Sequence, residues 1–332
     1  MKRKKLITIS LFSFLCLLAC AFASISYGAK SLNILTVIQS LFGNGSYDFS
    51  GSVVQARIGR TVFGILAGAA LSISGALMQA VTRNPISDPS ILGVNTGASL
   101  FVVCGISFLH ISTGNQYILL AFSGAAITAI LVYGLAFIGY GGATPMKLAL
   151  AGAAASTALQ SLVNTVMLPN TQVMDQFRFW QTGSISGATW EDIRIILPWL
   201  MAGFILSFAL ASSLNTLALG DETAAGLGLR VNLIRGLAAL AGVLLCAATT
   251  ALAGPIGFIG LMVPHFMRLI FGPDMHKVLP FSAIGGSCIL LLADVAGRLL
   301  GKPGELESGI ITAIAGAPVF ILIIRKAKVY SL

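Results

Sequence analysis

The sequence predicts an all-α polytopic membrane protein, a single transmembrane domain over residues 1–332 with about ten spanning helices. The first reason is composition. Hydrophobic residues make up 56% of the chain and charged residues 9%, whereas soluble domains carry roughly a quarter charged residues. The second reason is length: apolar runs of about 20 residues, enough to cross a hydrocarbon layer of about 30 Å, recur along almost the whole chain.

The apolar runs are separated by short polar stretches, and each run predicts one helix. The first run follows the basic residues 2–5 and resembles a signal sequence, but it continues to Tyr27 and is long enough to span. We therefore expect it to remain as the first span. The predicted spans are 6–27, 58–80, 91–109, 117–139, 148–168, 193–215, 236–253, 258–271, 279–300 and 310–324.

The basic residues predict that both termini are cytoplasmic. Cytoplasmic loops of membrane proteins carry an excess of lysine and arginine, and basic clusters lie at 2–5, before the first span, and at 325–328, after the last. An even number of spans also returns the chain to its starting side. The predicted location is a bacterial cytoplasmic (inner) membrane. Elsewhere the basic residues lie singly at the ends of apolar runs, so the net charge of +9 does not indicate nucleic-acid binding.

The cysteines and histidines predict neither a metal site nor a disulfide, and no cofactor is expected. Free cysteine inside an apolar run behaves as a small apolar residue. No CxxC pair is present, and the three histidines are scattered without ligand spacing. The five cysteines, all within apolar runs, are Cys16, Cys20, Cys104, Cys246 and Cys288.

The chain is not predicted to be an enzyme. It contains no GxxxxGKS/T phosphate loop and no Ser/His/Asp or HExxH arrangement, so ATP hydrolysis would need a separate subunit. The alternative is a gradient-driven secondary transporter, which normally needs ionisable groups inside the membrane. Asp294 is the candidate, but Arg298 follows four residues later, a spacing that favours an intrahelical ion pair over a proton relay.

Two helix faces stand out by spacing. Gly64, Gly68, Ser72 and Gly75 share one face of the second predicted span, and small residues there allow close helix packing in a membrane. The fifth predicted span carries a polar stripe, which should face the bundle interior or an aqueous pathway because polar groups are costly against lipid. Hydrogen bonding between helices is the alternative. The stripe consists of Ser156, Gln160 and Asn164.

The connection at residues 220–235 differs from the other loops between spans. Acidic residues open it, where they suit a helix N-terminus, and small apolar residues follow. Such a segment is either an interfacial helix or a docking helix that fits a groove on a partner protein. The residues expected to make that contact are Gly220, Asp221, Glu222, Ala225, Leu227 and Gly228.

Three groups of motifs lie in order along the chain. The first contains Arg57-Ile-Gly-Arg60, Ser74-Gly-Ala-Leu-Met-Gln79 and Arg83-Asn-Pro-Ile-Ser-Asp-Pro-Ser-Ile-Leu-Gly93. The second is Gly254-Pro-Ile-Gly-Phe-Ile-Gly-Leu-Met-Val-Pro-His265, and the third comprises Gly304-Glu-Leu and Gly316-Ala-Pro-Val-Phe320. In these motifs the chain resembles the iron-siderophore/cobalamin permease family, the membrane subunits of type II ABC importers. The resemblance covers residues 55–325.

The resemblance implies the membrane-spanning permease subunit of an ATP-binding cassette importer for a ferric siderophore or a related chelate such as haem or cobalamin. It implies a homodimer, or a pair with a paralogous permease, in the lipid bilayer. It also implies two cytoplasmic ATPase subunits and an extracytoplasmic substrate-binding protein. The segment 220–235 then matches the ATPase-coupling segment of the family, and the helix with the polar stripe lies beside the translocation pathway.

The resemblance also implies a role for arginines on the outer side. Family members use outward-facing arginines to receive carboxylates of the binding protein; Arg57 and Arg298 match those positions, and Arg60 lies one turn from Arg57. Snorkelling to lipid phosphates is the alternative. The chain departs from the family at Gly59 and Glu307, where proline is usual, and both positions belong to the predicted docking face.

Overall fold

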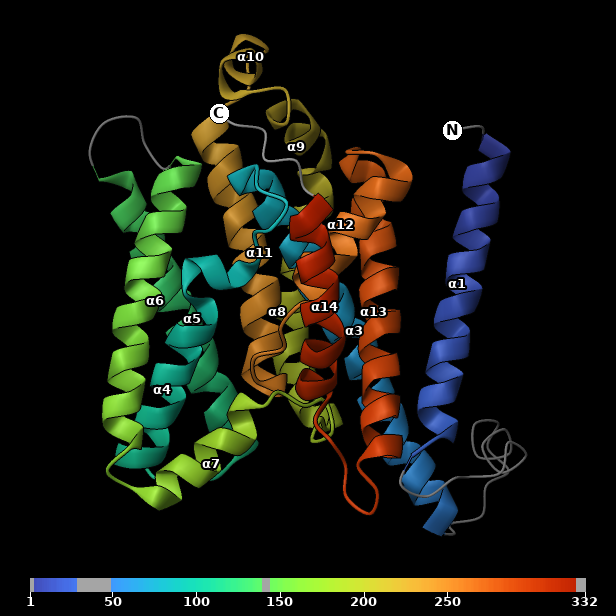
Figure 1. Ribbon diagram of the computed structural model, residues 1–332, viewed down its shortest axis with the longest axis vertical. Coiled ribbons are helices and arrows are strands. Elements are labelled where there is room, and N and C mark those ends of the chain that lie inside the picture. Colours follow the sequence, from blue (N-terminus) through green and yellow to red (C-terminus); the bar gives the residue numbers. More distant parts are fainter. Residues whose placement is uncertain (1–2, 29–48, 139–143, 327–332) are drawn as a thin grey trace.

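The computed structural model describes residues 3–28, 49–138 and 144–326, and every regular element within these ranges is helical (Figure 1). A 3₁₀ turn, η1 (Pro89–Leu92), precedes α4. The α-helices are α1 (Arg3–Ser26), α3 (Phe49–Thr82), α4 (Val94–Phe108), α5 (Gly114–Phe137), α6 (Pro145–Met167), α7 (Thr171–Gln181), α8 (Trp190–Ala209), α9 (Ala211–Leu217), α10 (Asp221–Gly226), α11 (Val231–Ala253), α12 (Ile259–Phe271), α13 (Met275–Leu300) and α14 (Ser308–Lys326).

The prediction of about ten spans is confirmed for the described residues. Seven helices are long and apolar enough to cross a membrane, and the apolar helices α4, α12 and α14 are shorter. Together these coincide with the ten predicted runs. The start of α1, the end of α14 and the short helix α10 lie at one end of the bundle, and α7 lies at the other (Figure 1). Below, the end with α10 is called the inner end and the end with α7 the outer end.

Helix α3 is the axis of the bundle and packs against α11, α12 and α13. Its 34 residues extend about 51 Å, so it projects beyond a hydrocarbon layer of about 30 Å. The predicted small-residue face makes the close contacts: a Cβ at Gly75 would overlap the carbonyl of Gly260, and one at Gly68 would overlap Gly286. The packing interpretation of this face is therefore confirmed.

Two predicted boundaries are wrong. No helix was predicted between the spans 148–168 and 193–215, but this stretch contains α7, whose Val173 and Phe177 are buried. Such a short amphipathic helix lacks the long apolar run by which the spans were recognised. The sixth predicted span is broken at Leu210 into α8 and α9.

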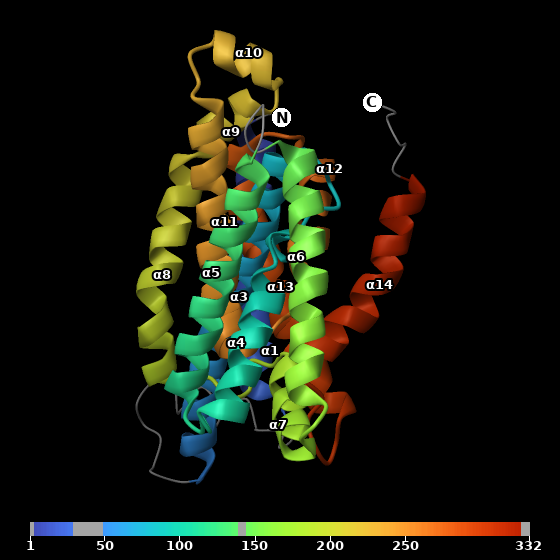
Figure 2. The same cartoon turned by 90° about the vertical axis from the view of Figure 1, so that its left-hand side faces the viewer.

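Seen from the side, α14 leans away from the other helices toward its C-terminal end (Figure 2).

Candidate functional site

An ion cluster at the outer end joins α3 to α13. Asp294, 1% exposed, accepts from Arg60 at an Nη2–Oδ1 distance of 2.6 Å and from Arg298 at an Nη2–Oδ2 distance of 2.8 Å. Arg60 also contacts Glu305, with 2.8 Å between Nη1 and Oε2. The predicted intrahelical pair of Asp294 with Arg298 is therefore confirmed. Arg60, 234 positions away from Asp294, completes the cluster.

The C-terminal end of α1 supplies further acceptors to the same cluster. Arg298 donates from Nη1 to the carbonyls of Ser24 and Tyr27, both at 2.9 Å. Arg57 donates from Nη1 to the carbonyl of Ser26 at 3.2 Å, one of its contacts with this end of α1. The last carbonyls of a helix have no intrahelical donor and carry partial negative charge, so they suit guanidinium groups.

The structure thus brings the three predicted docking arginines together, but it buries them. Arg298 is 1% exposed and Arg57 9% exposed. Arg60 keeps 11% of its side chain exposed and lies beside the more exposed carboxylate of Glu305. Within this cluster, three guanidiniums and two carboxylates leave one positive charge. Docking of these arginines on the binding protein remains a prediction. Of the three, Arg60 is the one that forms an ion pair with a surface residue, Glu305.

A second ion cluster lies at the inner end, around Asp221 at the start of α10. Arg83 approaches Asp221 Oδ1 with Nη2 at 2.5 Å, and Arg235 approaches the same oxygen with Nη2 at 3.0 Å. Arg83 directly follows α3 and also donates to the carbonyl of Leu217 at 2.9 Å. Asp221 therefore joins the end of α3, the start of α10 and the first turns of α11.

Of the remaining predicted coupling residues, two are glycines in turns and three have exposed side chains. Gly220 and Gly228, on either side of α10, have φ angles of +111° and +84°, which glycine adopts without strain. Glu222, Ala225 and Leu227 are exposed. The predicted coupling loop 220–235 is too long, because α11 already begins at Val231 and residues 231–235 form its first turns.

The polar stripe lies on α6, with Gln160 Nε2 donating to Asn164 Oδ1 at 3.3 Å. Ser156 is half-buried, and its hydroxyl lies 3.4 Å from Thr96 Oγ1 of α4. A second row of hydroxyl side chains, which is exposed, lies beside the stripe on α6. The sequence analysis missed this row, although its members have the same four-residue spacing. The hydroxyls of this row each donate to the carbonyl four positions earlier, at 2.8–3.0 Å; its members are Thr157, Ser161 and Thr165.

The model of the FecCD transport family matches residues 16–326. The chain belongs to the FecCD transport family.

Curated FecCD relatives cover nearly the same length. The Fe(3+)-citrate import system permease protein YfmD of Bacillus subtilis (strain 168) is 41% identical over 305 residues, 92% of this chain and 90% of that protein. The ferric enterobactin transport system permease protein FepD of Escherichia coli (strain K12) is 40% identical, with 91% and 90% covered. A solved metal-chelate type ABC transporter in an inward-facing conformation superposes with a TM-score of 0.83 at 26% identity, covering 96% of this chain and 99% of that one.

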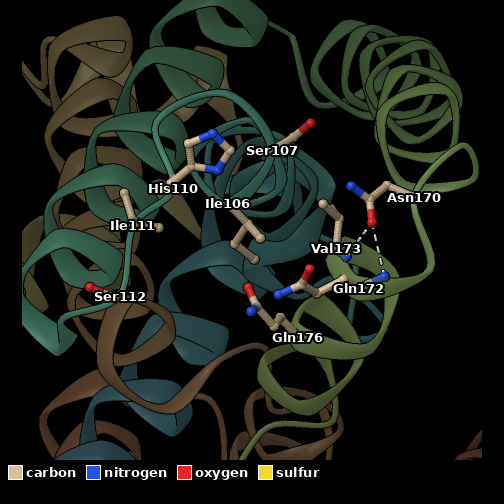
Figure 3. Close-up of a pocket in the computed structure, with 9 residues that line it drawn as sticks. All are labelled: Ile106, Ser107, His110, Ile111, Ser112, Asn170, Gln172, Val173 and Gln176. Atoms are coloured by element: carbon tan, nitrogen blue, oxygen red, sulfur yellow. Dashed lines mark hydrogen bonds between the residues drawn. The ribbon is translucent and has the colours of Figure 1, made fainter.

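The outer end of this FecCD chain also contains a polar hollow of about 290 Å³ between α7 and the connection from α4 to α5 (Figure 3). Asn170 caps α7 by accepting from the backbone N–H groups of Gln172 and Val173. Gln176 borders this hollow and a second hollow of about 370 Å³. Helix α7 therefore has two hollows beside it. Sequence reasoning missed these residues because it placed no helix here.

Proposed function

We propose that this FecCD-family chain is the permease subunit of an ATP-binding cassette importer that carries a ferric siderophore or a related ferric chelate into the cytoplasm. The observation that carries the proposal is the full-length family match, supported by relatives named for ferric citrate and ferric enterobactin. A chelated metal needs no metal ligands along its path, and the α6 stripe offers only uncharged amides and hydroxyls.

The active unit is proposed to be a dimer of this chain, or a pair with a paralogous permease, with the pathway between the two subunits. The support is the exposed face of α6, where hydroxyl and amide groups would be costly against lipid. Thr157, Ser161 and Thr165 use their hydroxyl protons within the helix, so the face offers little to bind a passing chelate tightly. Gln160 and Asn164 lie beside this row.

The inner end is proposed to receive two cytoplasmic ATPase subunits through α10. Glu222, Ala225 and Leu227 form the exposed side that would enter a groove on the ATPase. Asp221 is then a positioning residue, because its carboxylate is held by Arg83 and Arg235 within the chain. Through these two arginines, a movement of α10 would pass to α3 and α11. Both termini would lie on this side of the membrane.

The outer end is proposed to dock an extracytoplasmic binding protein. The excess positive charge of the cluster of Arg57, Arg60 and Arg298 favours acidic partners, although screening by salt limits the effect to within about 10 Å. Glu305 covers part of Arg60, so an incoming carboxylate would compete with Glu305 for that guanidinium.

Uptake of radiolabelled iron chelates tests the proposed function. A strain deleted for this chain should lose uptake of one ferric chelate, measured beside cobalamin, and regain it on complementation. Co-purification with an ATPase should accompany the rescue. Uptake that persists without the ATPase and disappears in Asp294→Asn would instead support a gradient-driven transporter.

A bulky substitution tests the pathway separately. Gln160→Trp should lower uptake while the complex still assembles, because the indole would obstruct the proposed path. Leu119→Trp is the matched control, since Leu119 is 70% exposed on the apolar surface of α5 and should accept an indole without loss. Normal uptake by Gln160→Trp would remove α6 from the pathway.

A further inference from the structure

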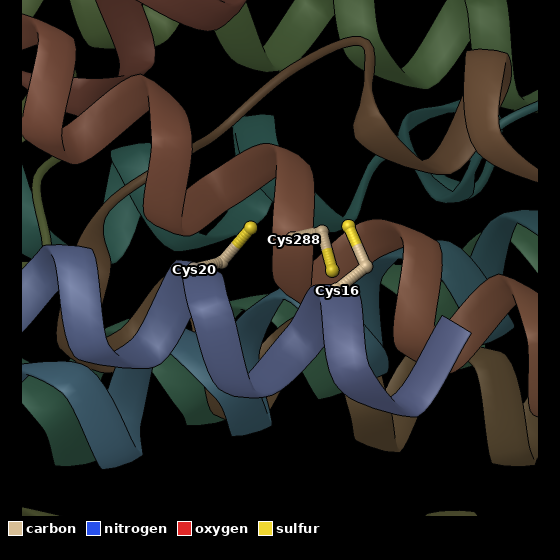
Figure 4. A group of neighbouring side chains, drawn as sticks. All are labelled: Cys16, Cys20 and Cys288. Atoms are coloured by element: carbon tan, nitrogen blue, oxygen red, sulfur yellow. The ribbon is translucent and has the colours of Figure 1, made fainter. Parts of the chain in front are cut away.

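Three of the five cysteines meet at the contact between α1 and α13, although they are far apart in sequence (Figure 4). Cys16 and Cys20 lie one turn apart on α1, and Cys288 comes from α13. Their three sulfur atoms lie within 4.8 Å of one another. The expectation that the cysteines are separate apolar residues therefore misses this group, because only the packing of the first helix on a late one assembles it.

The surroundings of the three sulfurs are apolar. Cys20 is 6% exposed and Cys288 8% exposed, and both pack with Leu291 in a small cluster separate from the main core. Cys16 is exposed. Cys16 and Cys288 lie near the middle of α1 and α13, and Cys20 lies one turn farther along α1. Within the described residues, the ligand group assembled here contains sulfur and neither carboxylate nor imidazole.

The spacing of the sulfurs fits a three-coordinate ion. With metal–sulfur distances of about 2.3 Å, a planar three-sulfur site has its sulfurs about 4 Å apart. The observed separations of up to 4.8 Å need only small side-chain rotations to reach that geometry. An ion here would connect α1 to α13, since two ligands come from one helix and the third from the other.

Ligand type and number select the ion. Sulfur ligands favour soft ions such as Cu⁺ and Zn²⁺ over Mg²⁺ or Mn²⁺. Zn²⁺ in protein sites takes four ligands, whereas three sulfurs are assembled here. Cysteine binds a metal as its thiolate, so Cu⁺ held by all three sulfurs displaces three protons, one from each thiol. No electron is transferred.

We propose that Cys16, Cys20 and Cys288 form a three-sulfur binding site for a soft monovalent cation, Cu⁺ or its analogue Ag⁺. The site is distinct from the proposed transport path, because α1 and α6 lie on opposite sides of the bundle (Figure 1). The proposal therefore stands whether or not the chain carries a ferric chelate.

Competition for Cu⁺ against bicinchoninate tests the proposal on the full-length protein in lipid nanodiscs, under anaerobic and reducing conditions. One Cu⁺ should be retained per chain, and copper X-ray absorption should show sulfur neighbours at about 2.3 Å. Cys16→Ser, Cys20→Ser and Cys288→Ser should each weaken retention by about tenfold or more. Cys104→Ser and Cys246→Ser are the controls and should bind as the wild type does, with size-exclusion profiles confirming that every variant is folded.

Three results would overturn the site. They are failure of the wild type to retain Cu⁺ against bicinchoninate, nitrogen or oxygen neighbours in the absorption spectrum, and equal losses in the control variants. A disulfide between α1 and α13 in protein purified under nitrogen, detected by mass spectrometry, would also overturn it, since the sulfurs would then be consumed.

Discussion

The two ends of α3 carry the same arrangement in different surroundings. At the outer end, Asp294 is shared by Arg60 and Arg298; at the inner end, Asp221 is shared by Arg83 and Arg235. The Asp294 side chain is 1% exposed, whereas that of Asp221 is 44% exposed. A carboxylate shared by two guanidiniums is therefore buried at the outer end and partly exposed at the inner end, where Arg83 is exposed and Arg235 is buried.

The difference in exposure decides what each cluster can do. A buried charge that loses its partner is left without compensation, so the Asp294 cluster fixes α13 against α3. The pair of Arg83 with Asp221 is exposed and can exchange its partners for water at little cost, although Arg235 is buried, so this part of the inner cluster can rearrange. This contrast supports assigning the outer cluster to the fold and the inner cluster to the coupling movement.

The largest effect is expected for Asp294→Ala. This change leaves Arg60 and Arg298 without their shared carboxylate, and loss of one partner of a buried pair costs about 3–5 kcal/mol. The protein should express poorly or unfold at a clearly lower temperature in detergent. Wild-type thermal stability of Asp294→Ala would show that the outer cluster does not hold the fold.

A substitution of glycine by alanine compares packing at the two ends. A Cβ at Gly297, beside the outer cluster, would overlap the carbonyl of Leu306, whereas a Cβ at Gly226 of α10 meets nothing within 4 Å. Gly297→Ala should therefore destabilise the protein by about 1–3 kcal/mol. Gly226→Ala should leave stability unchanged or raise it by up to about 1 kcal/mol. Equal melting temperatures for the two variants would contradict this difference.

Asp221→Ala should lower stability by less than Asp294→Ala does, because Asp221 and Arg83 are 44% and 37% exposed and only Arg235 is buried. Uptake should nevertheless fall strongly, since α10 would lose its connection to Arg83 and Arg235. Thermal unfolding and uptake, measured on the same variant, separate the two effects. Glu222→Ala is the companion variant: it should weaken co-purification with the ATPase while leaving the internal cluster intact. Normal uptake by Asp221→Ala would exclude the positioning role.

The smallest effect is expected from salt. Raising the ionic strength from about 0.1 M to 1 M shortens the screening length from about 10 Å to 3 Å. Amide hydrogen exchange in α10 should accelerate moderately, while exchange in the outer turns of α13 should not change. Similar acceleration at both ends would show that the exposure of the two aspartates does not govern their response.

Some parts of this picture could be predicted because they depend on neighbouring positions. The pair of Asp294 and Arg298 and the stripe on α6 follow from helical spacing, and both appear where expected. The row of Thr157, Ser161 and Thr165 has the same four-residue spacing and could have been predicted in the same way. Helix α7 was not, because eleven amphipathic residues give no long apolar signal.

By itself, the sequence determined the class of the protein, the number of its spans and the residues that share a helix face. Composition, run length and period are local properties, and the bilayer gives them a direct structural meaning. Only the tertiary structure decided which faces meet: Arg60 with Asp294, Arg83 and Arg235 with Asp221, and Cys16 and Cys20 with Cys288. It also decided which cluster is sealed from water. Exposure depends on every helix packed around a residue, and no spacing within one helix contains that information.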